Sequence, residues 1–347
     1  MKPISGSRKG NYLIRLSIFL ITAVSIAGTA GCDGCGYDPP PSQNLEIRSW
    51  YDLDAIRNNL AGDHILMNDL DSTTSGYTEL ASPTAHGGKG WQPVVIFHPH
   101  GPTAYTGFMG TFDGHGYEIS GLFIDRGEEG YVGLFGAVDS GGVTRDIGMV
   151  NVCVISDYDV GGLVGKNDGT VRNSYSIGNT TGRDRVGGLF GSNTGSVSNS
   201  YSTGTVTGEW GVGGLGGDSE AIVRDSHFTG TVTANDSVGG LVGDNRGEGI
   251  VSNSYSTGSV TGTSRVGGLV GSTNYGVVSN SFWDIETSGQ FDSAGGTGQT
   301  TAQIKNITTF SGVTWNITAV ANPGVRNRSY VWNIVNGVTY PFLSWQP

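Results

Sequence analysis

The sequence predicts an all-β fold, the parallel β-helix, in which the chain winds through stacked coils of about 26 residues. A string of six residues, VGGLVG or a close variant, begins at Val160, Val186, Val212, Val238 and Val266. A second string of the type VSNSYS recurs in phase with it, first at Val171. A fixed period in the twenties is typical of a solenoid, whose repeats bury their apolar faces against one another.

Each repeat contains three short β-prone pieces, separated by Gly, Asn and Asp, so we expect three short strands per coil. The third piece, as in Thr205-Val206-Thr207, alternates in polarity, which predicts an inward Val between two outward Thr residues. A β-propeller would instead need four strands in a repeat of about 40–50 residues.

Stacking of the coils predicts columns of equivalent side chains. The columns read from the second string are a polar one (Asn173, Asn199, Asp225, Asn253, Asn280), a serine one (Ser174, Ser200, Ser226, Ser254, Ser281) and an aromatic one (Tyr175, Tyr201, His227, Tyr255, Phe282). The polar column can satisfy backbone groups at turns, and the aromatic column can stack. The glycine pairs, such as Gly187-Gly188, are expected to take positive φ or to pack closely at a corner.

Both ends of a solenoid need a cover, because open strand edges invite aggregation. At the N-terminal end, Ser49-Trp-Tyr-Asp52 fits a capping box that opens a short helix with Leu53, Ile56 and Leu60 on one face. At the C-terminal end, aromatic residues are expected to cover the last coil: Trp315, Trp332, Tyr340, Phe342 and Trp345. The domain boundaries follow as a cap over 45–109, a β-helix over 110–283 and a C-terminal cap over 284–347.

Residues 1–31 are expected to be an export signal. In this segment a basic leader precedes the apolar run Leu16 to Ala27, and the run is too short to span a bilayer. The run ends in Thr29-Ala30-Gly31-Cys32, which resembles a lipoprotein signal with Cys32 as the lipidated residue. Residues 32–44 then form a lipidated tether rich in Pro and Gly. Plain secretion after cleavage at Ala30, or an uncleaved anchor, are the alternatives.

Composition narrows the possible partners. Removal of the leader leaves 15 Lys and Arg against 30 Asp and Glu, a balance that excludes nucleic acid as a partner. Cys32 and Cys35 form a CxxC pair, but lipidation of Cys32 would leave no redox or metal site there. Cys153 lies in an apolar run and is expected to be a buried, inert thiol.

Catalysis or metal binding would need residues that meet in space. The acidic candidates lie near predicted coil turns (Asp113, Asp125, Asp146, Asp168) or in predicted loops (Asp157, Asp159, Asp184). None is expected to recur as a column beside a Lys or Arg, and so we expect no catalytic residues. His86, His98, His100 and His115 fall within thirty residues, which leaves metal binding open, although exposed loop histidines are the commoner explanation. No cofactor is expected.

The repeated strings resemble the GLUG-motif repeat family of exported bacterial and archaeal surface proteins, named for its Gly-Leu-(any)-Gly core. The resemblance covers most of the chain after the leader and is most specific over residues 132–283. It implies a right-handed β-helix and a surface location, and it brings no catalytic motif. We therefore expect a lipid-anchored protein of the cell envelope that is not an enzyme. Its expected role is adhesin-like, with surface glycans or proteins as partners; the alternative is a carbohydrate-active β-helix, a polysaccharide lyase or hydrolase.

Overall fold

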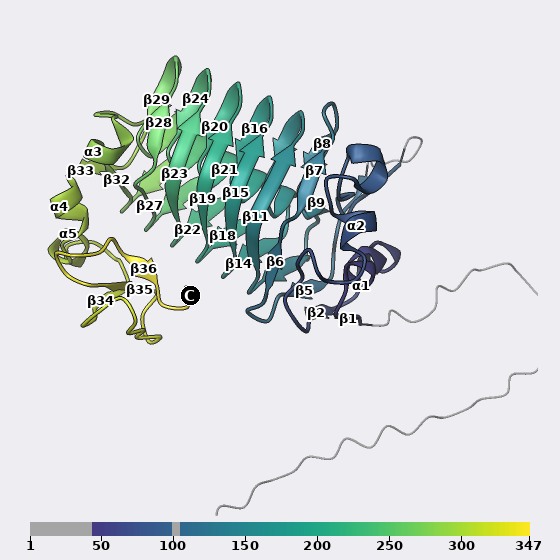
Figure 1. Cartoon of the computed structure of the whole chain (residues 1–347). Coiled ribbons are helices and arrows are strands. Elements are labelled where there is room, and N and C mark those ends of the chain that lie inside the picture. Colours follow the sequence, from purple (N-terminus) through teal and green to yellow (C-terminus); the bar gives the residue numbers. More distant parts are fainter. Residues whose placement is uncertain (1–43, 99–104) are drawn as a thin grey trace, which may run out of the picture. The chain divides into compact units, whose positions relative to one another are not determined.

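The computed structural model describes residues 44–98 and 105–347, which confirm the parallel β-solenoid of about six coils (Figure 1). The predicted leader, the lipidation at Cys32 and His100 lie outside the described residues. Within the described part, none of the helices is long and apolar enough to cross a membrane.

Each coil passes through four walls, which are parallel sheets running along the solenoid. Wall 1 contains β1 (Glu46–Ile47), β2 (His64–Leu66), β5 (Thr111–Asp113), β10 (Val143–Arg145), β14 (Thr170–Arg172), β18 (Ser196–Ser198), β22 (Ile222–Arg224), β26 (Ile250–Ser252) and β31 (Val277–Ser279). Wall 2 contains β6 (Glu118–Ser120), β7 (Phe123–Asp125), β11 (Gly148–Ile155), β15 (Tyr175–Thr181), β19 (Tyr201–Thr207), β23 (His227–Thr233), β27 (Tyr255–Ser256), β28 (Ser259–Thr261), β32 (Phe282–Asp284) and β33 (Thr297–Gln299).

Walls 3 and 4 have six strands each. Wall 3 contains β8 (Gly130–Val132), β12 (Tyr158–Val160), β16 (Asp184–Gly187), β20 (Trp210–Gly213), β24 (Asp236–Gly239) and β29 (Ser264–Gly267). Wall 4 contains β9 (Phe135–Val138), β13 (Val164–Asn167), β17 (Phe190–Asn193), β21 (Gly216–Ser219), β25 (Val242–Arg246) and β30 (Val270–Asn274). Outside the walls, β3 (Ile96–Phe97) and β4 (Tyr105–Thr106) form a hairpin.

The expectation of three strands per coil is wrong, because a coil has four. The string VGGLFG divides at a corner: β16 ends at Gly187 and β17 begins at Phe190. The second string also turns a corner, between walls 1 and 2. After this corner, the end of the second string and the third β-prone piece form a single strand, the seven-residue β19, which contains Gly204 at φ 131°. A Cβ on Gly204 would lie 1.9 Å from the carbonyl oxygen of Gly178 in the neighbouring coil, so only glycine fits there.

The core follows the predicted alternation. In β19 Val206 is buried and Thr205 is exposed. The leucines of the glycine-rich string form a fully buried column: Leu134, Leu163, Leu189, Leu215, Leu241 and Leu269. Cys153 does not follow its prediction, because it is only half-buried, whereas Val152 and Val154 on either side of it point inward. Alternation along β11 therefore places the thiol on the outer face.

Two columns have left-handed backbone conformations, one at the corner between walls 1 and 2 and one within the strands of wall 3. The predicted polar column lies at φ 47–51°, as do Asp146 before it at 55° and, in wall 3, a column that includes Asp159 at 51° and Arg185 at 52°. Asn and Asp tolerate this region better than most residues, which explains their recurrence. Gly187 does not take positive φ; a Cβ there would lie 2.1 Å from the carbonyl oxygen of Phe190, so close packing is the reason for the glycine.

The N-terminal helix forms as predicted. In α1 (Trp50–Ala55), the hydroxyl of Ser49 accepts the N–H of Asp52 at 3.2 Å, and Leu53 and Ile56 are fully buried. The other short helices at this end are η1 (Ile56–Asn58), α2 (Tyr77–Leu80) and η2 (Ala85–Gly88).

The C-terminal residues cover more than the last coil. They contain α3 (Ile285–Ser288), α4 (Thr301–Ile304), α5 (Thr308–Ser311), and a small sheet of β34 (Ile317–Ala319), β35 (Trp332–Ile334) and β36 (Phe342–Leu343). Residues 313–347, here called the C-terminal lobe, pack against the aromatic column of wall 2. Trp315 contacts Phe282 of the last coil, but Trp345 lies 6.2 Å from Tyr175, four coils earlier in the column. The lobe therefore lies along the flank of the solenoid.

Candidate functional site

Most polar columns of the solenoid are occupied in holding the coils together. Each hydroxyl of the serine column donates to the carbonyl two residues earlier at 2.8 Å, and those of Ser200, Ser226, Ser254 and Ser281 also accept the N–H of the serine one coil back, at 3.1–3.3 Å. In wall 4 the amide of Asn167 donates to Asn193 at 2.8 Å, and Asn193 donates to Ser219 at 3.1 Å. These buried groups are satisfied internally and are not open to a ligand.

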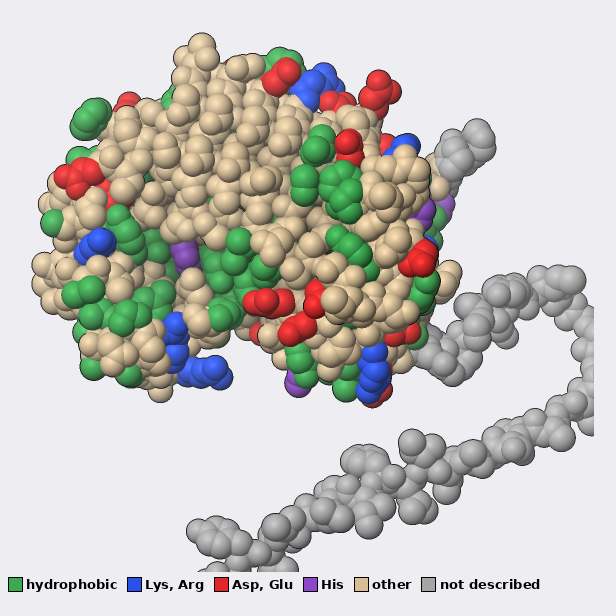
Figure 2. Space-filling view, in the orientation of Figure 1, with side chains coloured by type: hydrophobic (Ala, Val, Ile, Leu, Met, Phe, Trp, Pro, Cys, Tyr) green, Lys and Arg blue, Asp and Glu red, His purple; other side chains and the backbone are tan. Residues whose placement is uncertain are grey.

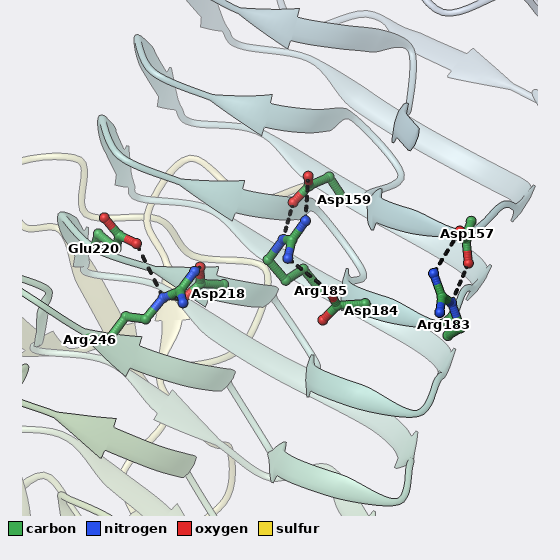
Figure 3. A network of polar contacts seen from close by, with 8 residues as sticks. All are labelled: Asp157, Asp159, Arg183, Asp184, Arg185, Asp218, Glu220 and Arg246. Atoms are coloured by element: carbon green, nitrogen blue, oxygen red, sulfur yellow. Dashed lines mark hydrogen bonds and ion pairs between the residues drawn. The ribbon is translucent and has the colours of Figure 1, made fainter. Parts of the chain in front are cut away.

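Several of the acidic candidates are paired with arginines one coil away, so the expectation of no such pairing is wrong (Figure 3). Arg183 binds Asp157, and Arg185 binds Asp159, each through two contacts of 2.6 and 3.0 Å. Arg185 also contacts Asp184 at 2.8 Å. The spacing of 26 residues, which is one coil, is the sequence signal that could have shown this. These ion pairs link neighbouring coils on the outer surface.

Asp218 is the carboxylate in Figure 3 whose environment is most unusual. Burial raises its pKa to about 6, although two contacts from the Arg246 guanidinium oppose that shift. A raised carboxyl pKa can mark a general acid. Asp218 is only 4% exposed and is held by Arg246, so a substrate could not reach it without breaking the pair. A structural role fits this geometry.

The aromatic column stacks as predicted from Tyr175 to Tyr255 and is buried by the C-terminal lobe. Ring centroids of Tyr175 and Tyr201 lie 4.8 Å apart at 2°, and His227 lies 5.0 Å from both Tyr201 and Tyr255. Trp332 packs on His227 from the lobe at 5.7 Å. Burial lowers the pKa of His227 to about 3, so this imidazole is neutral at physiological pH. The column is therefore a packing surface within the molecule.

A groove of about 650 Å³ lies where the lobe meets the first coils. It is lined by Asp69, Asp113, His115, Gly116, Glu118, Arg145, Asp146, Ile147, Gly148, Asn173, Tyr175, Arg328, Trp345 and Pro347. Figure 2 shows acidic side chains on the β-helix side of a hollow and Lys or Arg side chains on the lobe beside it. Its size is within the range of small-ligand pockets, so it is the best candidate site.

Two of the predicted acidic candidates, Asp113 and Asp146, line the groove and bind the same arginine. Arg145 contacts Asp113 at 2.5 Å and Asp146 at 2.8 Å, and Asn173 donates to Asp146 at 2.9 Å. The hydroxyl of Tyr175 donates to Glu118. Burial, then this contact, raises the pKa of Tyr175, which keeps its hydroxyl protonated as a donor.

His115 also lines the groove, whereas the remaining sequence candidates among the described residues lie away from it. Asp125 is exposed on wall 2, and Asp168 pairs with Lys166 at 3.2 Å. His86 contacts the carbonyl of Gly90, and His98 contacts Thr106, at 2.8 and 2.7 Å, so the histidines are not brought together. Among residues 44–98 and 105–347, no group of three or more His, Cys, Asp or Glu is placed to hold a metal ion.

Sequence reasoning missed Asp69, Glu118 and the lobe residues Arg328 and Trp345 as members of one site. They lie up to about 280 residues apart in the sequence, and no motif joins them. Asp69 and Glu118 meet within the first coils, and the docking of the lobe on wall 2 adds Arg328 and Trp345 to them. The signal in the sequence was limited to the density of acidic residues and His115 near the first coils.

Comparisons with known proteins agree with the repeat architecture. A family model described as the GLUG motif matches residues 156–181, 182–207 and 234–261. The chain is 34% identical over 149 residues, 42% of its length, to halomucin of Haloquadratum walsbyi, and 35% identical over 132 residues, 36% of its length, to a protein of Evansella cellulosilytica named "Putative Gly-rich membrane protein". These matches span only 2% and 14% of those relatives.

Among solved structures, a crystal structure described as a "putative immunoglobulin A1 protease" from Bacteroides ovatus matches with a TM-score of 0.61. The match covers 89% of this chain and 94% of that one, at 18% identity, and therefore shows the fold alone. The chain therefore contains GLUG-motif repeats and folds as a parallel β-solenoid.

Proposed function

We propose that this protein is a non-catalytic recognition protein of the cell envelope, held by a lipid on Cys32, with an adhesin-like role toward surface glycans or proteins. The groove between the first coils and the C-terminal lobe carries this proposal, because it offers accessible carboxylates and the partly exposed ring of Trp345. Elsewhere, the serine column and the column of Asn167, Asn193 and Ser219 are hydrogen-bonded from coil to coil. The two relatives, one named halomucin and one a Gly-rich membrane protein, support a surface location.

The lipid anchor is tested by Cys32→Ala. This variant should move from the membrane fraction to the soluble fraction, because the acylated sulfur is lost. Cys35→Ala is the matched control and should stay with the membrane. A Cys32→Ala protein that remains membrane-bound would contradict the anchor.

The recognition role is tested by applying residues 44–347 to arrays of glycans and of surface proteins. Binding without any change in the bound molecule is the expected result. Turnover of acidic or neutral polysaccharides would instead support the second candidate, a carbohydrate-active enzyme. The observation that favours this second candidate is the presence of two carboxylates in the groove, Asp113 and Asp146, which bind the same guanidinium. Two carboxylates flanking a bond are the usual requirement for glycoside hydrolysis, but here both accept the same arginine.

A further inference from the structure

The carboxylates of the groove divide into a neutralised pair and an unneutralised pair. Asp113 and Asp146 share Arg145. Asp69 accepts the backbone N–H of Glu118 at 2.9 Å, and Glu118 accepts the Tyr175 hydroxyl. Within the described part of the chain, neither Asp69 nor Glu118 forms an ion pair with a Lys, Arg or His. The second pair therefore leaves two neighbouring negative charges open to a cation.

Aromatic surfaces lie beside this unneutralised pair. The ring of Tyr175, whose hydroxyl meets Glu118, lies 6.2 Å from the indole of Trp345 at 33°. The indole N–H of Trp345 is buried and has no acceptor among the described residues. Carboxylates next to aromatic rings favour a ligand that carries both a positive charge and an apolar face.

The backbone at the groove is not available to an extended peptide. β11 pairs with β15 on one side and with β6 and β7 on the other, and β5 lies between β2 and β10. A peptide that adds a strand needs a free edge. The polar groups of the groove are side chains, including the amide of Asn173, which suits the scattered hydroxyls of a sugar.

We propose that the groove binds a glycan through an amine-bearing sugar, with the ammonium group at Asp69 and Glu118 and the sugar ring against Trp345. This inference rests on the proposed recognition function and names its ligand class. Arg328, on the lobe side of the groove, carries a charge like that of the ammonium group and opposes its binding.

The test is calorimetric titration of residues 44–347 with glucosamine oligomers and with N-acetylglucosamine oligomers of equal length, at a pH where the free amine is protonated. The amine form should bind at least about tenfold more tightly, since acetylation removes the charge. Glu118→Gln and Asp69→Asn should each weaken binding of the amine form by at least about tenfold. Both variants keep a hydrogen-bonding side chain of the same size, so the fold should be retained.

Two matched controls separate charge at the groove from charge elsewhere. Asp125→Asn removes an exposed carboxylate that does not line the groove and should leave binding unchanged. Arg328→Ala removes a like charge and should strengthen binding of the amine form. Trp345→Ala should weaken it, with circular dichroism as the check on folding.

Each contrary result has a separate meaning. Equal affinity for the acetylated oligomers would overturn the amine contact while leaving glycan recognition standing. Oligolysine that binds with the same dependence on Glu118, while the sugars do not bind, would overturn the glycan assignment. If neither binds to the folded protein, the groove is not an amine site, and only the arrays then decide the wider recognition role.

Discussion

His227 replaces a tyrosine in the aromatic column and remains buried between Tyr201 and Tyr255. Its pKa is lowered from 6.5 to about 3, so below pH 6.5 the unfolded chain binds a proton that the folded chain does not. The free energy of unfolding should therefore fall as the pH drops from 6.5 toward 3, by at most about 1.4 kcal/mol per pH unit from this group.

His227→Tyr should remove that contribution and restore the repeat. We expect urea denaturation curves of the variant and the parent to differ more at pH 4 than at pH 7, with the variant more stable in acid. Tyr255→His would be the reverse change and should introduce a second acid-sensitive site. A constant difference between His227→Tyr and the parent across this pH range would contradict a buried neutral imidazole.

The left-handed corner at Asn253, with φ 48°, gives a second prediction at this scale. Asn253→Ala should lower the free energy of unfolding by about 1–2 kcal/mol. Alanine is strained in the left-handed region, because it lacks the short polar side chain that lets Asn adopt this conformation. Asn253→Gly should be better tolerated, since glycine adopts this conformation freely. Chemical denaturation of both variants measures the difference, and an alanine variant as stable as the glycine variant would refute the argument.

Inward-facing and outward-facing side chains of a coil differ in their contribution to stability, and Leu241 and Thr233 provide a test of this difference. Leu241 is fully buried at the corner between β24 and β25, whereas Thr233 is exposed in β23. Leu241→Asp should destabilise the protein by more than about 3 kcal/mol, because it deletes core packing and buries a charge. Thr233→Asp should change stability by less than about 0.5 kcal/mol. Similar thermal unfolding of the two variants would reject the inward assignment of Leu241.

At the scale of elements, the sequence predicted what the period and polarity determine. The inward Val206, the stacked Tyr175 and Tyr201, and the cap helix at Ser49 were all readable locally. The number of walls could not be predicted locally, because a glycine pair is compatible both with a corner between two strands and with the interior of one strand. Gly187 packs closely inside VGGLFG at a corner, while Gly204 lies within one bent strand.

At the scale of the molecule, the candidate site could not be predicted, because it depends on the docking of the C-terminal lobe. The aromatic residues of the lobe were expected to cover the last coil, and their composition alone does not state which coil they meet. In the structure the small sheet of β34, β35 and β36 places Trp345 against Tyr175. Glu118 and Arg328 then line one groove, although no sequence pattern connects them.

The lobe is joined to the solenoid mainly through apolar contacts, which leads to a prediction about how the molecule comes apart. Trp332 is fully buried and lies 4.9 Å from Trp315 and 5.7 Å from both His227 and Tyr255. Trp332→Ala should lower the free energy of unfolding by about 3–5 kcal/mol through lost packing. This loss weakens the contact between the lobe and wall 2. The coils of the β-helix keep their own hydrogen bonds and buried leucines, so they should remain folded.

Limited proteolysis with mass spectrometry measures this separation. In Trp332→Ala, cleavage should appear first within residues 313–347, while a fragment containing the coils persists. Tyr330→Ala is the control: this neighbouring side chain is 40% exposed, and its loss should leave the cleavage rate close to that of the parent. The aromatic column would be uncovered in the Trp332 variant, so a dye that binds apolar surface should fluoresce more strongly with it. Cleavage of lobe and coils at one common rate would instead show that the two unfold as a single unit.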